Sequence, residues 1–534
     1  MLERELKFHV PARQRAGVKA HLRKLKAEPI ALHARYFDTP DQALARAQIA
    51  LRLRLEGDVW VQTMKTPGPD ELSRIEWNHP RPEPTLDLSV YEDTHVGPLI
   101  ARLAPRLRCR YVTQVTRLKK VVPTESGSAE LAYDEGRIMA GDIELPIHEL
   151  EVEGVSGETG DLFALARDWL REHQLLLELR SKAARGDAIA ALADEEGLDV
   201  RIAPGIDTPT GGKIMRRSSR LTAKQSQQLT AAARAKHPIL AKNIGIRAAY
   251  LECANECMSQ ILRNSGFLAG LDGLKASPEQ RIEHVHQLRV GIRRLRACWK
   301  LFGDVANPPE PLAEALKQYF RVLGQARDND VIQTELLPRL MHAGMPPDTD
   351  LPAKRSAGKA ASLATLAASP EFQETLLDLL EYLVIYGDEL ESRGAGKRAA
   401  PMLCKQLNAW LDGIRKEVPL FLEAGWDARH RMRKRVKRLR YGMEFAQGLL
   451  DQARLRPLAN ALVSAQKTLG QLNDLYIAAE YYRGPGAKHP SAMFALGWLA
   501  ATQEHEARAS QLALKQLAKA GRFHPAEGKR RKGG

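Results

Sequence analysis

The chain has 534 residues, of which 44% are hydrophobic, so it is long enough to form two or three domains with ordinary buried cores. It contains no apolar run of the roughly 18 residues that a membrane span needs, and its charged opening differs from a signal peptide, so we expect a cytoplasmic protein without a membrane segment. Its 80 Lys and Arg residues against 65 Asp and Glu give a net charge of +15, which favours an anionic partner. The five cysteines include no Cys-x-x-Cys pair and support neither a disulfide framework nor a structural zinc site.

Residues 1–200 alternate short β-like segments with turns, a spacing that predicts an antiparallel sheet or barrel. The segments are 2–10, 49–56, 59–65, 73–78, 111–122, 129–134, 137–140 and 144–153. Helical periodicity at 11–27 and 161–176 predicts two helices that flank or plug this sheet.

The pattern becomes helical almost throughout from residue 225, with Pro and Gly at the breaks. Residues 201–224, which are rich in Pro and Gly, are predicted to form a linker, and residues 521–534 a disordered basic tail. We therefore expect an α+β protein with a β domain at 1–200 and an all-α domain at 225–520. The all-α domain is predicted to consist of two repeat units, 225–370 and 371–520.

Two predicted strands carry an ionisable side chain at every second position, and because side chains alternate across a strand these groups share one face. They are Glu3, Glu5 and Lys7 in the first strand, and Glu149, Glu151 and Glu153 in the last. Two such strands facing one another would form an oxygen-rich site suited to a hard divalent cation such as Mg²⁺ or Mn²⁺. A single strand of this kind is more often a solvated face, so the argument depends on the whole set.

Cationic side chains follow the same alternation in other predicted strands. They are Arg52 with Arg54, Arg117 with Lys119, and Lys65 and Arg74 at strand ends. A barrel lined with both signs of charge suits a phosphate substrate, because carboxylates can hold a metal ion that bridges phosphate oxygens while Arg and Lys neutralise the leaving phosphate.

Two basic segments of the helical half repeat one pattern. At about 100° per residue, the side chains of His286, Arg289, Arg293 and Arg296 fall within an arc of roughly 80°, beside an apolar arc, and those of His430, Arg433, Lys437 and Arg440 do the same. The first segment contains His286, Arg289, Arg293, Arg294 and Arg296, and the second His430, Arg433, Lys437, Arg438 and Arg440. A further match downstream, 323–328 with 469–474, indicates a duplicated helical unit.

Like charges crowded on one helix face repel each other, and a polyanion bound between the two stripes would neutralise them. A solvated basic face is the alternative. The stripes contain no aromatic residues for base stacking, so we expect bare phosphate chains rather than a sequence-specific nucleic acid.

The first 200 residues resemble the CYTH family, which belongs with the triphosphate tunnel metalloenzymes. The motifs that carry the resemblance are Glu3-x-Glu5-x-Lys7, Tyr36-Phe37-Asp38-Thr39-Pro40, Leu51-Arg52-Leu53-Arg54, Lys65, Arg74-x-Glu76, Arg117-x-Lys119, Asp134-Glu135-Gly136, Glu149-Leu150-Glu151-Val152-Glu153 and Ser181-Lys182-Ala183-Ala184-Arg185-Gly186. The resemblance implies an eight-stranded antiparallel tunnel that binds a linear triphosphate with one or two divalent metal ions.

Site roles follow from the same resemblance. The implied metal ligands are Glu3, Glu5, Asp134, Glu149, Glu151 and Glu153. The implied triphosphate-binding residues are Lys7, Arg52, Arg54, Lys65, Arg74, Arg117, Lys119 and Lys182. The implied catalytic residues are Glu5, Lys65, Glu76 and Lys182. Asn78 departs from the family pattern, in which another acid is common, and this bears on the number of metal ions. We interpret His148 as a rim residue rather than a base, and Asp38 as part of a turn or cap.

The helical half resembles the CHAD domain, a module that commonly follows CYTH domains in bacteria, and His286 and His430 occupy its histidine positions. The resemblance implies two related helical bundles around a basic channel that binds inorganic polyphosphate. Because both histidines lie on the basic arc, we expect them to contact phosphate. Completion of helix packing is the alternative role.

The leading hypothesis is a metal-dependent inorganic triphosphatase that hydrolyses tripolyphosphate to pyrophosphate and phosphate, with a second domain that binds polyphosphate and could associate the protein with polyphosphate granules. One alternative is a mainly non-catalytic polyphosphate-binding or granule-associated protein. Another is a tunnel enzyme acting on ATP, as an adenylate cyclase, or on thiamine triphosphate.

Overall fold

A computed structural model of the chain describes residues 2–68, 72–197, 221–274, 276–331, 336–346, 363–484, 486–487 and 490–526. Most of the predicted linker, 201–220, and the end of the predicted tail, 527–534, lie outside the described residues. The chain divides into two compact units. Unit 1 comprises Met1–Ala232, Leu262–Arg281 and Ala364–Gly387, and unit 2 comprises Ala233–Ile261, Ile282–Leu363 and Asp388–Gly534. The predicted domain and repeat boundaries stay predictions.

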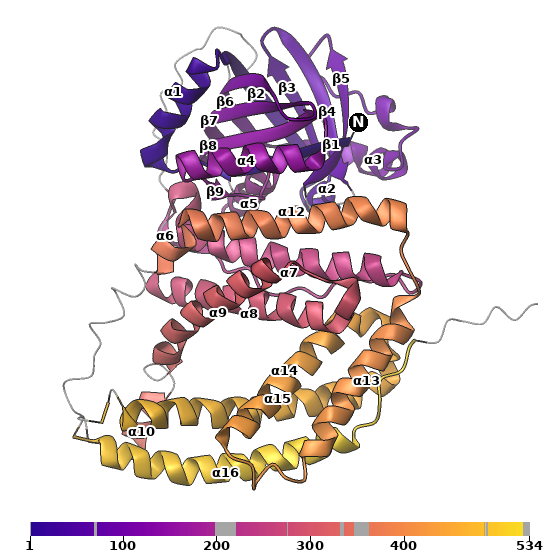
Figure 1. Ribbon diagram of the computed structural model, residues 1–534. Helices are drawn as coiled ribbons and strands as arrows, with labels where there is room; N and C mark the ends of the chain where they lie inside the picture. Colours follow the sequence, from indigo (N-terminus) through magenta and orange to yellow (C-terminus); the bar gives the residue numbers. More distant parts are fainter. Residues whose placement is uncertain are drawn as a thin grey trace, which may run out of the picture. The chain divides into compact units, whose positions relative to one another are not determined.

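Unit 1 contains a closed antiparallel barrel of eight strands within its described residues (Figure 1). The strands are β1 (Leu2–His9), β2 (Glu28–Asp38), β3 (Ala50–Glu56), β4 (Val59–Pro67), β5 (Ser73–Arg81), β6 (Arg108–Pro123), β7 (Ser128–Ala140) and β8 (Ile143–Ser156). Their order is β5-β4-β3-β2-β6-β7-β8-β1, and pairing of β1 with β5 closes the barrel. The short strand β9 (Leu176–Leu177) adds to β1. The predicted fold class is confirmed.

Two details of the barrel differ from the sequence prediction. Strand β2 was not among the predicted strands, and the predicted segments 129–134 and 137–140 form one continuous strand, β7. Gly136 lies inside β7 and does not mark a turn. A Cβ atom at this position would lie 2.0 Å from the carbonyl oxygen of Gln114 on β6. The glycine is required by close approach of the two backbones.

Helices cover the barrel and fill one end of it. Helices α1 (Arg15–Lys24) and α4 (Thr159–His173) confirm the two predicted flanking helices and lie outside the barrel, α4 against β8. Helices α2 (Ala43–Arg46) and α3 (Gly97–Leu103) share an outer apolar core with β3–β5. Helix α5 (Lys182–Glu195) packs apolar side chains against lumen-facing residues of the barrel. These lumen-facing residues are Leu32, Ala34, Tyr36, Tyr111 and Val115. One end of the lumen is therefore a packed apolar core.

The structure describes both short and long α-helices in the helical half. They are α6 (Ala223–Leu229), α7 (Ile246–Ala269), α8 (Pro278–Phe302), α9 (Glu310–Val331), α10 (Leu337–His342), α12 (Pro370–Arg393), α13 (Ala399–Glu417), α14 (Trp426–Ala446), α15 (Gln452–Arg483) and α16 (Ala492–Lys519). The two basic segments lie on α8 and α14, and their downstream matches lie on the next helices, α9 and α15. Among the described helices, none is both long enough and apolar enough to cross a membrane.

Candidate active site and anion-binding channel

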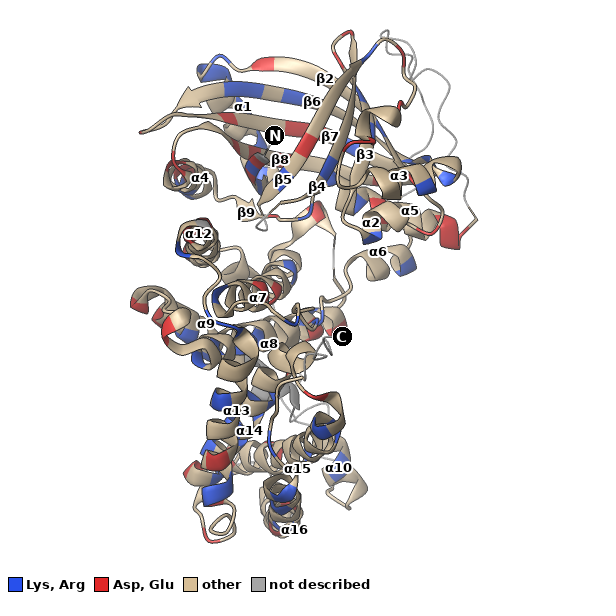
Figure 2. Cartoon of the chain, turned by 90° about the vertical axis from the view of Figure 1, so that its right-hand side faces the viewer, with Lys and Arg blue, Asp and Glu red and all other residues tan. Residues whose placement is uncertain are grey.

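The barrel lumen encloses a cavity of about 800 Å³, and the strands around it carry both signs of charge (Figure 2). Its charged lining residues come from β1, β3–β8, α5 and the segment before α5. They are Glu3, Glu5, Lys7, Arg52, Arg54, Glu56, Lys65, Arg74, Glu76, Arg117, Lys119, Glu130, Asp134, Glu151, Glu153, Glu178, Lys182 and Asp187. All residues that the sequence assigned to metal binding, triphosphate binding and catalysis are among them, except Glu149.

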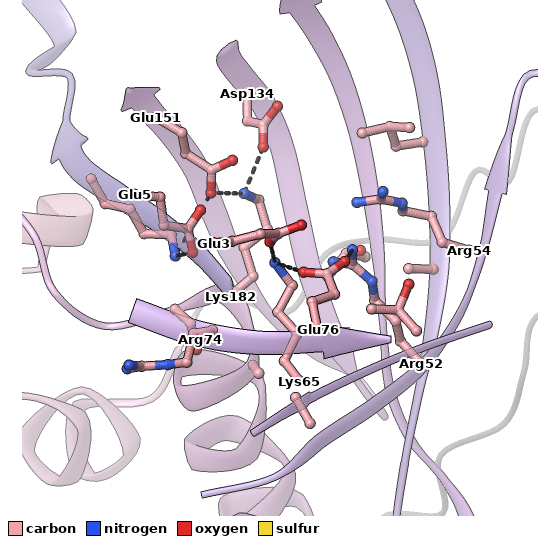
Figure 3. Close-up of a pocket in the computed structure, with 18 of the residues that line it drawn as sticks. Glu3, Glu5, Arg52, Arg54, Lys65, Arg74, Glu76, Asp134, Glu151 and Lys182 are labelled. Atoms are coloured by element: carbon pink, nitrogen blue, oxygen red, sulfur yellow. Dashed lines mark hydrogen bonds and ion pairs between the residues drawn. The ribbon is translucent and has the colours of Figure 1, made fainter. Parts of the chain in front are cut away.

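Two arginines of the cavity lie across from three of its carboxylates. Figure 3 shows the carboxylates of Glu5, Glu151 and Asp134 on one side and the guanidinium groups of Arg52 and Arg54 on the opposite side. Arg52 and Arg54 lie on β3, whereas the three acids lie on β1, β8 and β7. A linear anion in the lumen can therefore contact cations along one side and face carboxylates along the other.

Lys182 is surrounded by three carboxylates. Its Nζ lies 2.5 Å from Asp134 Oδ2 and 3.0 Å from Glu151 Oε1, and it also pairs with Glu149. Arg117 donates to Asp134 at 2.7 Å and to Glu151 at 2.5 Å. Burial favours the neutral form of Glu151, but Lys182 and Arg117 outweigh burial and hold its pKa well below the ordinary value. This cluster is internally neutralised in the absence of a ligand.

Lys65 forms a second cluster with Glu3 and Glu76. Its Nζ lies 3.0 Å from Glu3 Oε2 and also pairs with Glu76, whose carboxylate lies 3.9 Å from Arg52. Burial and the hydrogen bond to Glu76 raise the pKa of Glu3 to about 7. Burial also opposes ionisation of Glu76, but Glu3, Lys65 and Arg52 together lower the pKa of Glu76. The two carboxyl groups are thus driven apart, one toward the acid form and one toward the carboxylate.

Glu153 stands next to Glu5 across the β1–β8 pairing. Glu5 forms an ion pair with Lys7, while Glu153 makes no ion pair within 4 Å among the described residues. Burial, followed by the nearby charge of Glu5, raises the pKa of Glu153 to about 7. Two lumen carboxyls, Glu153 and Glu3, are therefore only partly ionised at neutral pH.

This set of donors fits a hard divalent cation. Glu3, Glu5 and Glu153 supply carboxylate oxygens, the ligands that Mg²⁺ and Mn²⁺ prefer. A cation beside Glu3 and Glu153 would offset the carboxylate repulsion and burial that raise their pKa values. Asp134, Glu149 and Glu151 also offer one oxygen each within 4.8 Å of one another, although Lys182 occupies the space between them.

Three further residues that were predicted to bind triphosphate have local partners. Arg54 Nε donates to Glu56 at 2.6 Å, and Lys119 lies 3.6 Å from Glu130. Arg74 lines the cavity and donates to the backbone carbonyl of Ser73 at 2.7 Å. In Figure 3 its guanidinium points away from the Lys65 and Lys182 clusters. A phosphate ligand would compete with these partners for the same donors.

Three residues that the sequence left at the edge of the site divide into two that lie outside the lumen and one that lines it. His148 faces away from the lumen, 3.8 Å from Glu135, and burial lowers its pKa to about 4. Asp38 accepts the backbone N–H groups of Thr39 and Leu44, so it caps the short helix α2 as expected. Asn78 lines the cavity.

A buried ion-pair network below α5 was not predicted. Glu149 accepts a hydrogen bond from Arg185 at 2.6 Å, and Arg185 also lies 3.2 Å from Asp272. Asp272 in turn accepts from Arg180 at 2.8 Å, and Arg180 pairs with Glu178. Asp272 belongs to the 3₁₀ turn Leu271–Gly273 in the helical half of the sequence but to unit 1 in space. Nothing in the local sequence pattern around Asp272 connects it to Arg185.

A second cavity, of about 870 Å³, lies in unit 2 between α8, α9, α14 and α15. Its lining residues include twelve Lys or Arg side chains and one carboxylate, that of Asp474. The cations are Arg289, Arg293, Arg296, Lys300, Lys317, Arg321, Arg433, Lys434, Arg435, Lys437, Arg438 and Lys467. His286 and His430 line the same cavity. The two stripes that the sequence predicted thus face one channel, which has almost no negative charge of its own.

Aromatic side chains hold the channel arginines in place. The Phe320 ring on α9 lies 5.3 Å from Arg289, 5.4 Å from Arg293 and 5.7 Å from Arg296, measured from guanidinium carbon to ring centre. Arg293 Nη1 donates to the hydroxyl of Tyr441 on α14 at 3.3 Å, which joins the first stripe to the second. Phe320 was not among the predicted site residues, although it lies between the channel cations Lys317 and Arg321 on the same helix.

The downstream matches lie beside the stripes. Asn473 on α15 is buried and lies 3.1 Å from His430 Nδ1. Gly324 on α9 lies beside Arg289, since a Cβ atom there would come within 3.3 Å of the guanidinium. The side chains of residues 325–330, part of the first match, lie outside the described residues.

Two residues of the predicted stripes do not line the channel. Arg294 is buried, and it donates to Gln260 at 2.9 Å and to the carbonyl of Lys236 at 2.6 Å. Arg440 forms an ion pair with Glu444 one helical turn away, at 2.7 Å. Neither is among the residues that line the channel, and each has a structural partner of its own.

Lys437 is the most strongly perturbed cation in the channel. Burial, followed by the positive charges of Arg433 and Arg293, lowers its pKa to about 6. Arg438 lines the same cavity and places its guanidinium 4.7 Å from the Trp410 ring. The free channel therefore carries more positive charge than the fold can hold fully ionised.

Comparisons with known proteins match two successive segments of the chain. The CYTH domain model matches residues 1–186, and the CHAD domain model matches residues 256–483. An inorganic triphosphatase of Haemophilus influenzae is 32% identical over 158 residues, which cover 28% of this chain and 44% of that protein. The chain thus spans less than half the length of this relative.

Solved structures with similarity to the chain match one half or the other. The CHAD domain of the plant Ricinus communis is 26% identical with a TM-score of 0.47, and the match covers 55% of this chain and 99% of that one. A protein of Hippeastrum, described as a putative adenylyl cyclase with a dominant triphosphatase activity, is 18% identical with a TM-score of 0.27 over 35% of this chain and 96% of that one. On the evidence of the two domain models, the chain belongs to the proteins that carry a CYTH domain followed by a CHAD domain.

Proposed function

We propose that the CYTH domain is a metal-dependent inorganic triphosphatase that hydrolyses tripolyphosphate to pyrophosphate and phosphate. One observation carries the proposal: a single cavity of about 800 Å³ is lined by many carboxylates and cations together, with Arg52 and Arg54 across from Glu5, Glu151 and Asp134. A phosphate chain needs cations along its length, and hydrolysis of its terminal unit needs a metal ion and a positioned water. The lumen offers cations for the phosphate chain and carboxylates that could hold the metal ion and orient the water.

The residues of the chain divide the work as follows. Glu3 and Glu5, with the later glutamates of β8, would hold Mg²⁺ or Mn²⁺, which supplies Lewis-acid stabilisation of the phosphate oxygens. Arg52, Arg54 and Arg117 bind and align the non-bridging oxygens.

Water attacks the terminal phosphorus in line, a new P–O bond forms as the anhydride P–O bond breaks, and a lumen carboxylate takes the proton of the water. Lys65 and Lys182 neutralise the charge that moves onto the leaving phosphate, and Glu76 positions the ammonium group of Lys65.

Two variants of the full chain test the tunnel chemistry. Glu5→Gln removes a metal-binding oxygen and Arg54→Ala removes a phosphate donor, and each should lower kcat for tripolyphosphate by roughly 100-fold or more. The matched controls are Glu135→Gln and Arg137→Ala, which change charged residues on the outer face of β7. Phosphate release is measured with Mg²⁺ and with Mn²⁺. Turnover equal to that of the unmodified protein in both tunnel variants would contradict the proposal.

A substrate panel separates the inorganic substrate from the alternatives. Tripolyphosphate, ATP and thiamine triphosphate are compared on the full chain with one metal ion at equal concentration. We expect the highest kcat/KM for tripolyphosphate, because the lining of the lumen is dominated by charged groups. Faster turnover of ATP or of thiamine triphosphate would replace the inorganic substrate with an organic one. Negligible turnover of all three would favour a non-catalytic role.

We also propose that the CHAD channel binds inorganic polyphosphate, so that the protein can associate with polyphosphate granules. The support is the channel lining, in which twelve cations stand against one carboxylate. The two stripes carry no aromatic ring on which a nucleic-acid base could stack, which favours a bare phosphate chain. The arginines of α8 and α14 lie on the same cavity, so a single phosphate chain can contact both stripes.

The test of the channel is the double charge reversal Arg289→Glu with Arg433→Glu. It should abolish binding of long-chain polyphosphate and leave tripolyphosphate hydrolysis unchanged, since neither residue lines the tunnel. Arg508→Glu, which reverses an exposed arginine on α16, is the control and should bind polyphosphate normally. Unchanged binding by the double variant would contradict the channel assignment.

A further inference from the structure

A cluster of two histidines and one glutamate lies outside the tunnel, where the last turn of α1 meets the end of α4. His21 comes from α1, and Glu172 and His173 are the last two residues of α4. His21 Nδ1 lies 3.0 Å from His173 Nε2 and 3.2 Å from Glu172 Oε1, and His173 Nε2 lies 3.7 Å from the same oxygen. None of the three lines the tunnel cavity.

These three separations match those between the ligands of one metal ion. Donor atoms at the 2.0–2.1 Å distance typical of zinc, in tetrahedral arrangement, are about 3.3 Å apart. The observed separations of 3.0, 3.2 and 3.7 Å lie around this value. Imidazole nitrogens with one carboxylate suit zinc, cobalt or nickel, whereas magnesium and calcium prefer oxygen donors alone. The donor set therefore differs in kind from that of the tunnel.

The surroundings hold the cluster in place. The His21 ring stacks on Trp169 with ring centres 4.3 Å apart. Gln14, before α1, donates to Gln174, which follows His173, at 3.1 Å and so ties the start of α1 to the end of α4. Both histidines lie in the last turns of their helices, where the backbone carbonyls favour a cation.

We infer that His21, Glu172 and His173 form a binding site for a divalent transition-metal ion such as Zn²⁺. The bound ion would join α1 to α4 on the outside of the barrel. An ion can enter from solvent, because the Glu172 side chain is 59% exposed and that of His21 29% exposed. His173, with 7% of its side chain exposed, forms the inner ligand. Water would complete the coordination.

The test uses the full chain in excess Mg²⁺, which occupies oxygen sites but competes poorly for imidazole. Titration with Co²⁺ should give the visible absorption bands of tetrahedral coordination, and Zn²⁺ should displace them. His21→Ala and Glu172→Ala, both at partly exposed positions, should each weaken Zn²⁺ binding by more than the roughly 10- to 100-fold that loss of a supporting residue costs a metal site. Tripolyphosphate hydrolysis should be unchanged in both variants.

Two controls keep the result specific. Asp168→Asn removes an exposed carboxylate from α4 outside the cluster, and His342→Ala removes an exposed imidazole from α10, and both should bind Zn²⁺ like the unmodified protein. A protein that shows no Co²⁺ absorption bands in Mg²⁺ would overturn the inference and leave His21 and His173 as a hydrogen-bonded pair. Zn²⁺ affinity unchanged in His21→Ala and in Glu172→Ala would overturn it too.

Discussion

Asp272 and Arg185 form an ion pair of 3.2 Å that joins two distant parts of the sequence. Arg185 lies in the segment matched by the CYTH model, and Asp272 in the segment matched by the CHAD model. Both side chains are almost completely buried, 2% and 1% exposed. Arg185 also contacts Glu149, which in turn pairs with Lys182 in the tunnel. A residue outside the CYTH segment therefore supports the position of a tunnel lysine.

Asp272→Asn is expected to lower the free energy of unfolding of unit 1 by roughly 1–3 kcal/mol, because buried Arg180 and Arg185 each lose one of their two carboxylate partners. Urea unfolding of the full chain measures the change. Asp304→Asn, which alters an exposed carboxylate in the same half of the sequence, is the control. An unchanged midpoint for Asp272→Asn would show that the network contributes nothing to stability. For the same reason a fragment of residues 1–200 should be less stable than the full chain.

Gly186→Ala should destabilise the packing of α5 against the barrel. A Cβ atom at Gly186 would lie 2.1 Å from the ring of Tyr111, so α5 must move away from the barrel wall. We expect a loss of roughly 1–3 kcal/mol in the free energy of unfolding, with a fall in triphosphatase activity as Lys182 shifts with α5. Gly160→Ala on α4 is the matched control, because its Cβ would meet no atom within 4 Å. Equal denaturation midpoints for the two variants would contradict the packing argument.

Polyphosphate binding should take up a proton through Lys437. The pKa of Lys437 is lowered to about 6, so in the free protein the amine is mostly neutral at pH 7.5, whereas a bound polyanion favours the ammonium form. Affinity should therefore fall as pH rises above 6. Titration calorimetry in two buffers of different ionisation enthalpy measures the uptake. Lys437→Met should abolish it, while Lys434→Met, at another lysine of the channel, should weaken binding and keep the uptake.

The same lowered pKa has a consequence for the stability of the free protein. Between pH 6 and the ordinary lysine pKa of 10.5, the unfolded chain binds a proton at Lys437 that the folded chain does not. Stability therefore rises with pH across this window. Substitution by methionine should flatten that rise in urea unfolding experiments, and a slope unchanged by the substitution would rule out Lys437 as its source.

The tunnel carboxyls should give the opposite dependence on pH. The pKa values of Glu3 and Glu153 are raised from 4.5 to about 7, so the folded, metal-free protein holds protons that the unfolded chain has lost. Its stability should fall as pH rises from about 4.5 to 7. Adding Mg²⁺ should release protons and restore stability, most strongly above pH 7. Chelator-treated protein is compared with and without Mg²⁺, and Glu153→Gln should reduce both effects while Glu135→Gln should not.

The sequence predicted the charged lining of both cavities because each cavity depends on local periodicity. Alternation in a strand places Glu3, Glu5 and Lys7 on one face wherever that strand lies in the barrel. Helical periodicity likewise places Arg289 and Arg293 on one arc of α8. Periodicity alone does not say whether a charged face is turned to a lumen or to solvent. The presence of several charged strands with both signs of charge indicated a shared lumen.

What the sequence could not predict depends on partners from other elements. Arg294 follows Arg293 directly, and only the positions of Gln260 on α7 and of the Lys236 carbonyl decide that it points away from the channel. Asp272 is a similar case, since its partner lies far away in sequence. Strand β2 was missed because its lumen side is apolar, where α5 packs on it, and so it lacks the charged alternation of the other strands.

The α5 plug has a consequence for how a polymer could be processed. With one end of the lumen occupied by packed side chains, a substrate must enter and its products must leave through the same opening. A phosphate polymer cannot pass through a pocket that is closed at one end, and can insert only a free terminus. If the pocket shortens long chains at all, it removes units from their ends and must release what it has cut before the next end goes in.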